Sequence, residues 1–156
     1  MRLDYLNPIV DSAVRALADV AGAPIERGSL RLIDQSRANN EVAAVIGMAG
    51  EVEGRIILEM NRCTAIAAAS VMNRESFSEL TPYVLDTVME LANVMIARGV
   101  SVLNDKGFTF RLTPPLVFTG NGLASFSSME LETLMVPLTT PAGEMNLNIA
   151  LRMKTL

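Results

Sequence analysis

The sequence contains no histidine, no tryptophan and a single cysteine among its 156 residues. Without histidine, neither a serine–histidine–aspartate triad nor a cysteine–histidine pair can be assembled. A zinc site would have to be built from carboxylates alone, which is not the ligand set that zinc takes in proteins. Cys63 has no partner for an internal disulfide, so we expect a cytoplasmic protein in which Cys63 is a packed small side chain rather than a redox centre.

Other features are scarce as well. A net charge of −4, with only two tyrosines and five phenylalanines, argues against a nucleic-acid-binding surface. Every apolar run long enough to span a membrane is interrupted by a charge, proline or glycine. No glycine-rich segment has the length and the following lysine of a phosphate-binding loop. Half of the residues are hydrophobic, so we expect one domain over residues 1–156 with a sizeable core.

Helix signals occur at three places. Asn7 and Pro8 predict the start of a first helix, because asparagine is a good N-cap and proline fits the first turn. Gly22 and Pro24 predict its end. Asn61 is expected to cap a short alanine-rich helix over residues 62–72. A third, longer helix follows and contains the features on which the functional argument depends.

Strand signals flank the second and third helices. Three segments near 30–33, 42–48 and 54–59 read as an antiparallel meander because their connections are short. Residues 108–112 alternate between apolar and polar side chains and residues 116–118 are apolar, so each segment is predicted to be a strand. Pro114-Pro115 between them predicts a sheet edge or a chain crossing. Residues 131–138 and 144–153 predict a closing hairpin. The expected fold class is α/β of the α+β kind: a mainly antiparallel sheet packed with two longer helices and one short helix.

The long helix extends from Thr81, an N-cap, and Pro82, which fits the first helical position. It could end at Gly99 or continue toward Gly107. Most of its circumference is apolar, but one narrow stripe is not. The stripe is formed by four residues spaced four, three and four apart, which stack on one face: Asp86, Glu90, Asn93 and Ala97.

The stripe has a plain interpretation and a functional one. A polar stripe is what the solvated side of any amphipathic helix displays. Against this, asparagine is a poor helix former, and no lysine or arginine stands at helical pairing distance from the two acids. Ala97 also leaves room beside Asn93 for another molecule to approach.

Glu90 and Asn93 cannot supply a strong nucleophile, but they can perform two simpler tasks. An amide can orient a water molecule by donating and accepting hydrogen bonds, and a carboxylate can pair with a lysine on a partner. These tasks are sufficient only for a substrate that is already reactive. An aspartyl phosphate is such a substrate, because positioning and electrostatics dominate phosphoryl transfer.

The pattern Asp86-x-x-x-Glu90-x-x-Asn93, with Pro114-Pro115 about twenty residues further on, resembles the signature of the CheC/CheX/FliY phosphatases. The opening Asn7-Pro8, the Gly54-Arg55-Ile56 strand, the Pro-Pro-x-Val-x-x-Gly segment and the closing hairpin extend the resemblance over the whole chain. The first helix carries Asp11, Arg15 and Ala18 at the same spacing as the long-helix motif. This is the pattern of a degenerate internal repeat in which the first copy retains the aspartate and has lost the glutamate and asparagine. Only the long helix therefore carries the intact motif. CheC proteins carry two such helices and CheX proteins one, so the sequence resembles CheX.

The resemblance implies a chemotaxis protein that dephosphorylates a CheY-type response regulator. Asn93 would orient the attacking water, and Glu90 would pair with the regulator's active-site lysine. Asp86 and Ala97 would lie on the same partner-binding surface. No cofactor is expected in this chain, since the Mg²⁺ would belong to the regulator, and a homodimer joined through sheet edges is expected. Two alternatives stay open: a non-catalytic domain that docks on a receiver, and an adaptor whose acidic stripe binds an unrelated basic partner.

Overall fold

The computed structural model describes residues 3–33, 40–120 and 132–153. In these ranges the chain forms helices α1 (Leu3–Ala21), α2 (Arg62–Asn73) and α3 (Pro82–Asp105). The strands are β1 (Glu26–Arg27), β2 (Arg31–Ile33), β3 (Val42–Gly50), β4 (Val52–Met60), β5 (Phe110–Leu112), β6 (Leu116–Thr119), β7 (Thr133–Thr140) and β8 (Gly143–Met153). No described helix is long and apolar enough to cross a membrane.

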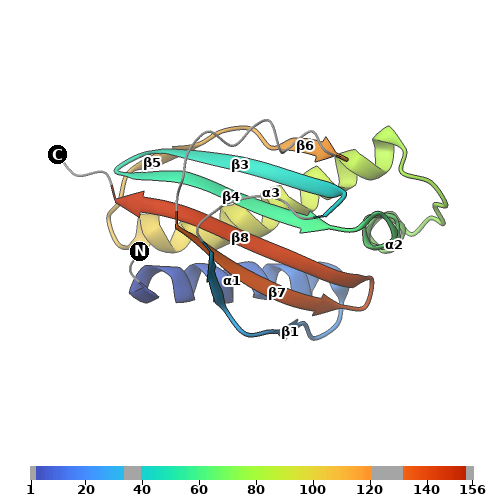
Figure 1. Ribbon diagram of the computed structural model, residues 1–156, viewed down its shortest axis with the longest axis horizontal. Helices are drawn as coiled ribbons and strands as arrows, with labels where there is room; N and C mark the ends of the chain where they lie inside the picture. Colours follow the sequence, from blue (N-terminus) through green and yellow to red (C-terminus); the bar gives the residue numbers. More distant parts are fainter. Residues whose placement is uncertain (1–2, 34–39, 121–131, 154–156) are drawn as a thin grey trace.

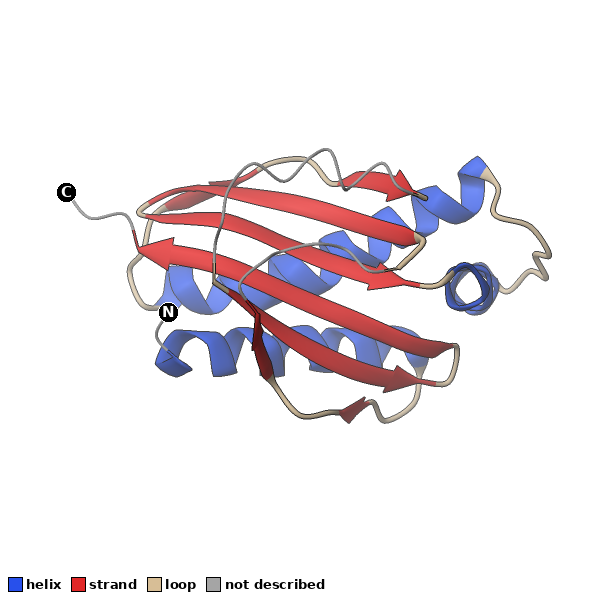
Figure 2. Cartoon of the chain, viewed as in Figure 1, coloured by secondary structure: helices blue, strands red, loops and turns tan. Residues whose placement is uncertain are grey.

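The described strands form one antiparallel sheet in the order β1-β7-β8-β4-β3-β5, with β2 also pairing with β7 and β6 with β3. Helices α1 and α3 lie side by side against one face of this sheet (Figure 1), and the short α2 lies beyond one end of the strands (Figure 2). The predicted fold class is therefore confirmed: a mainly antiparallel sheet is packed with two longer helices and one short one.

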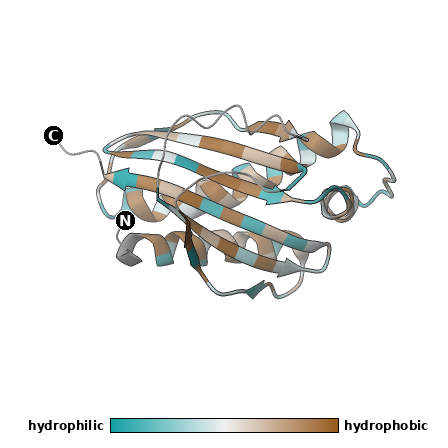
Figure 3. Ribbon diagram, in the orientation of Figure 1, coloured by the Kyte–Doolittle hydropathy of each residue, from teal (hydrophilic) through white to brown (hydrophobic). Residues whose placement is uncertain are grey.

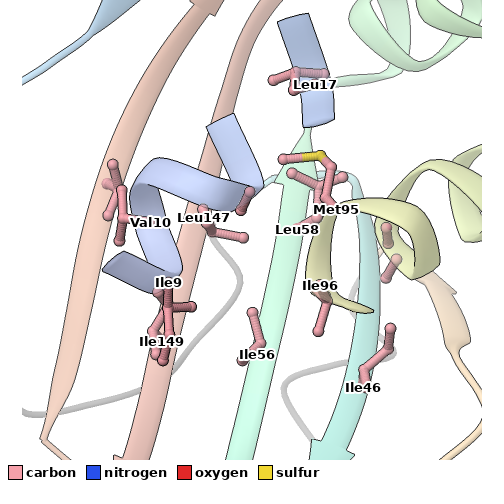
Figure 4. Close-up of a cluster of buried hydrophobic side chains, with 14 of the residues drawn as sticks. Ile9, Val10, Leu17, Ile46, Ile56, Leu58, Met95, Ile96, Leu147 and Ile149 are labelled. Carbon is pink, nitrogen blue, oxygen red and sulfur yellow. The ribbon is translucent and has the colours of Figure 1, made fainter. Parts of the chain in front are cut away.

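The main core lies between the helix pair and the sheet. Alternate residues of the long strands face the helices, because successive side chains in a strand point to opposite sides, and Figure 3 shows the resulting alternation of hydropathy along β8. Figure 4 shows side chains of the central strands directed toward both long helices. The buried residues that it labels are Ile9, Val10, Leu17, Ile46, Ile56, Leu58, Met95, Ile96, Leu147 and Ile149.

Gly99 lies inside α3 and does not end it. A Cβ atom at this position would meet the backbone oxygen of Ile9 at 3.0 Å and the Cβ of Ala13 at 3.5 Å. The glycine therefore allows the backbones of α3 and α1 to approach closely. The helix continues to Asp105 and is followed by Lys106 and by Gly107 with φ +88°, so of the two predicted ends the later one is correct.

The predicted start of the first helix was wrong. α1 includes Leu3, and Pro8 lies inside it although a proline there removes one helical hydrogen bond. Asn7 does not cap the helix; its Oδ1 instead accepts a hydrogen bond from Nη2 of Arg27 at 3.4 Å. The C-terminal prediction holds, because α1 ends at Ala21 and Gly22 adopts a φ of +65°.

The predicted three-strand meander is only partly correct. β3 and β4 form the expected hairpin, but β2 pairs with β7 near the other end of the chain. The second half mirrors this arrangement: β7 and β8 form a hairpin, while β5 and β6 pair with β3. Pro114-Pro115 falls between β5 and β6 at this sheet edge, as predicted. The short edge strands of each half therefore pair with the hairpin of the other half. An internal repeat is expected to give this arrangement.

Two smaller differences concern Cys63 and β7. Cys63 is exposed, so its predicted packing was wrong, because the buried face of α2 is formed by Thr64, Ala65, Ala68 and Ala69. The Asn61 cap is confirmed, since its side chain accepts a hydrogen bond from the Thr64 amide at 2.8 Å. β7 begins at Thr133, and Leu131, where the strand was predicted to start, lies outside the described residues.

Candidate functional site

The polar stripe of α3 faces away from the core. Asp86, Glu90, Asn93 and Ala97 are all exposed. The opposite side of the same helix is buried against α1 and the sheet, through Val88, Leu91, Ala92, Met95 and Ile96 among others. The structure therefore brings together the four residues that the spacing placed on one face.

The start of α3 sets the register of this stripe. The Thr81 hydroxyl accepts a hydrogen bond from the Val84 amide at 3.2 Å, and Pro82 occupies the first turn, as predicted. Because an α-helix rises 1.5 Å per residue, Glu90 and Asn93 stand about 4.5 Å apart along the axis. Their side chains are therefore close enough for one partner active site to contact both.

The polar side chains of the stripe are exposed to solvent. Within the described part of the chain, Asp86, Glu90 and Asn93 make no side-chain hydrogen bond or ion pair. Arg98, which follows the stripe, is held elsewhere, since its Nη1 lies 2.9 Å from Oδ2 of Asp19 on α1. The Asn93 amide and the Glu90 carboxylate thus remain available to an incoming molecule.

The corresponding positions on α1 have a different environment. Asp11 forms an ion pair with Nη1 of Arg27, which follows α1 in β1. Arg15 is exposed, whereas Ala18 is half-buried and has no functional group. Asp11 is therefore engaged by Arg27, and the position that corresponds to Asn93 carries no amide, so α1 does not present the motif that α3 does.

A polar cluster ties the start of α3 to the end of α2. Nδ2 of Asn73 donates to the carbonyl of Ala69 and to Oγ1 of Thr87, each at 2.9 Å. Oδ1 of Asn73 accepts from the hydroxyl of Tyr83 at 3.2 Å. The Tyr83 ring also packs beside Phe77, with ring centroids 5.5 Å apart. These contacts hold the first two turns of α3 in place.

Tyr83 was missed in the sequence-based description of the stripe. It stands three residues before Asp86, so the series 83, 86, 90, 93, 97 continues the alternation of three- and four-residue steps. Tyr83 is 54% exposed despite these contacts. The signal was present in the spacing, but Tyr83 resembled an ordinary first-turn residue because it is neither acidic nor an amide.

The arrangement has limited chemical capability. It contains an amide that can donate to and accept from a water molecule, and a carboxylate that can receive an ammonium group. No group of three or more histidine, cysteine, aspartate or glutamate side chains in the described ranges is placed to hold a metal ion. The stripe is suited to assisting a reaction for which another molecule brings the electrophile.

The family model described as "Chemotaxis phosphatase CheX" matches residues 42–139, a range that includes the whole of α3. No curated protein sequence gives a match.

Several solved structures share the fold. A chain in the crystal structure of the CheX-CheY-BeF3-Mg²⁺ complex from Borrelia burgdorferi is 32% identical, with 97% of this chain and 99% of that chain covered and a TM-score of 0.83. A CheC-like superfamily protein from a Shewanella species is 24% identical, with 97% and 99% covered and a TM-score of 0.84. FliY of Thermotoga maritima is 15% identical, with 96% and 91% covered and a TM-score of 0.68. The latter two support the fold alone.

Proposed function

Because this chain belongs to the CheX family of chemotaxis phosphatases, we propose that it hydrolyses the aspartyl phosphate of a CheY-type response regulator. One observation carries the proposal: Glu90 and Asn93 are exposed one helical turn apart on α3, and neither side chain has a partner among the described residues. The relative from Borrelia burgdorferi supports the choice of partner, since its structure is that of a complex with CheY.

Asn93 is proposed to position the attacking water. Its Oδ1 accepts a hydrogen bond from the water while its Nδ2 donates, so the water oxygen is directed toward the phosphorus. The new bond joins the water oxygen to phosphorus, and the bond between phosphorus and the aspartyl oxygen breaks. The products are inorganic phosphate and the free aspartate carboxylate of the regulator. The protein's contribution is alignment, which is the main requirement for phosphoryl transfer.

Glu90 is proposed to hold the regulator in the correct register. Its carboxylate accepts a charge-assisted hydrogen bond from the ammonium group of the regulator's active-site lysine. Glu90 precedes Asn93 by one helical turn, so this pair places Asn93 beside the phosphoryl group. The small Ala97, one turn beyond Asn93, leaves space for the regulator's surface, and Asp86 lies against the same partner on the other side.

We propose that the Mg²⁺ enters with the regulator. The ion neutralises charge on the transferring phosphoryl group, and the described residues of this chain offer no cluster of ligands that could hold it. The chain then contributes only the amide and the carboxylate to a site completed by its partner.

The experiment is a dephosphorylation assay. A purified CheY-type receiver is phosphorylated with a small phosphodonor and Mg²⁺, and loss of the phosphoryl group is followed with and without a substoichiometric amount of the protein. Multiple turnovers that accelerate phosphate release are expected. Binding without acceleration would instead identify a non-catalytic docking domain. If the protein neither bound the receiver nor accelerated phosphate release, the remaining alternative would be an adaptor whose acidic stripe binds an unrelated basic partner.

A further inference from the structure

Tyr83 continues the functional stripe and has no role in the chemistry described above. We propose that Tyr83 is a docking residue that sets the affinity for the response regulator by stacking against a lysine or arginine side chain on the receiver surface. This inference rests on the proposed function, because it takes the receiver as the partner that covers α3. It concerns affinity and specificity and leaves the water-positioning step to Asn93.

The position of Tyr83 places it within the expected interface. Tyr83 stands seven positions before Glu90, a distance of about 10 Å along the helix axis. An interface of ordinary size covers about 800 Å² on each partner, which corresponds to a disc of roughly 16 Å radius. A receiver seated on Glu90 and Asn93 therefore extends over the first turns of α3, where half of the Tyr83 side chain is uncovered.

The ring is already held in one orientation. Its hydroxyl donates to Oδ1 of Asn73 at 3.2 Å, and Asn73 is fixed in turn by its bonds to Ala69 and Thr87. Phe77 supports the ring with a centroid distance of 5.5 Å and an interplanar angle of 38°. A partner that stacks on Tyr83 loses little affinity to ordering this side chain, which is why rigid aromatic residues make effective docking groups.

The negative charge of the stripe indicates which side chain of the receiver would contact Tyr83. Asp86 lies one turn further along, and i, i+3 neighbours on a helix are about 5–6 Å apart at Cβ. Neither Asp86 nor Glu90 has a cation at helical pairing distance. A ring face beside an unpaired carboxylate attracts a cation, since the π-electrons and the carboxylate act in the same direction. An arginine or lysine of the receiver, close to the lysine that meets Glu90, fits this environment.

The test measures binding separately from turnover. The receiver is activated with beryllofluoride and Mg²⁺, and its affinity for the full-length protein is determined by titration. Tyr83→Ala is expected to weaken binding about tenfold, the level typical of an interface anchor, and to raise KM for the phosphorylated receiver equally while kcat is unchanged. Met153→Ala is the matched control, because Met153 is also an exposed hydrophobic side chain, at 42%, and lies at the end of β8 away from the start of α3.

Two further variants define the chemistry of the contact. Tyr83→Phe keeps the ring and is expected to bind within about threefold of the wild type. Tyr83→Leu keeps an apolar side chain of useful size but has no π-face, so it is expected to lose most of what Tyr83→Ala loses. Wild-type affinity of Tyr83→Leu would overturn the cationic partner in favour of a purely apolar one. Thermal melting followed by circular dichroism verifies that each variant is folded.

The outcomes separate this inference from the proposed function. Wild-type affinity of folded Tyr83→Ala would overturn the inference while the phosphatase proposal stands. If the wild-type protein binds the activated receiver but does not accelerate phosphate loss, the proposed catalysis fails and the binding series still decides the role of Tyr83. If the wild-type protein binds no activated receiver, both proposals are overturned.

Discussion

Replacement of Asn93 by alanine is the most informative change that the structure offers. The side chain is exposed and makes no hydrogen bond within the described residues, so its removal leaves no buried group unsatisfied. Alanine is also the better helix former, by up to about 0.7 kcal/mol. Asn93→Ala should therefore be folded and at least as stable as the wild type, and any loss of activity cannot be attributed to unfolding.

The expected loss appears in turnover. The amide acts on the water in the transition state, and removal of one preorganised hydrogen-bonding group of this kind lowers kcat by about 100- to 1,000-fold. At 1.36 kcal/mol per tenfold change in rate, the loss corresponds to about 2.7–4 kcal/mol of transition-state stabilisation. Affinity for the receiver should change little, because Glu90 and the rest of the surface remain.

The assay follows decay of a phosphorylated CheY-type receiver with Mg²⁺, at saturating and limiting receiver concentrations. Asn93→Asp is a second variant: it retains the size of the side chain but loses the donor and places a negative charge toward the phosphoryl group, so it should fail as well. Arg15→Ala, on the exposed side of α1, is the matched control and should behave as the wild type. Unchanged turnover by Asn93→Ala would remove the residue from the mechanism and return the stripe to the solvated side of an ordinary helix.

Three further predictions follow from particular contacts. Glu90→Ala should weaken receiver binding roughly 30-fold and should also lower turnover, because it leaves the partner's lysine unpaired. Unchanged affinity in a titration with the beryllofluoride-activated receiver would contradict this. Gly99→Leu should destabilise the fold by about 1–3 kcal/mol through overpacking against Ile9, measured by denaturant unfolding, with Ala97→Leu on the exposed face as the control; equal midpoints would refute the close approach of α1 and α3. The protein should form a homodimer through its sheet edges, where Leu32 and Leu116 are more than half exposed; sedimentation at micromolar concentration that shows only the 16.8 kDa species would argue against it.

Local signals were reliable where the chain forms hydrogen bonds with its own neighbours. Thr81 and Asn61 cap the helices that they were predicted to cap, because an N-cap acts on amides only two or three residues away. The β7–β8 hairpin was also predictable, since its two strands are adjacent in the sequence. Asn7-Pro8 was misread because it has the composition of a helix start, while hydrogen bonding and packing along α1 retain Pro8 inside the helix.

Long-range pairing had no comparable signal. β2 pairs with β7, about 100 residues away, through only three residue pairs, and so short a segment does not encode its partner. The exposure of Cys63 depended likewise on which side of α2 turned toward the core. In both cases, the outcome depends on the packing of the whole domain rather than on local propensity.

The sequence by itself determined the candidate site. Helical periodicity placed Asp86, Glu90, Asn93 and Ala97 on one face, because each position follows from the angle per residue and from nothing else in the fold. Only the tertiary structure decided that this face is exposed, that α1 packs on the opposite side at Gly99, and that Tyr83 is held at the end of the stripe by Asn73 of a different helix. Periodicity states which residues share a face, whereas burial and contacts between helices depend on segments that meet only when the chain folds.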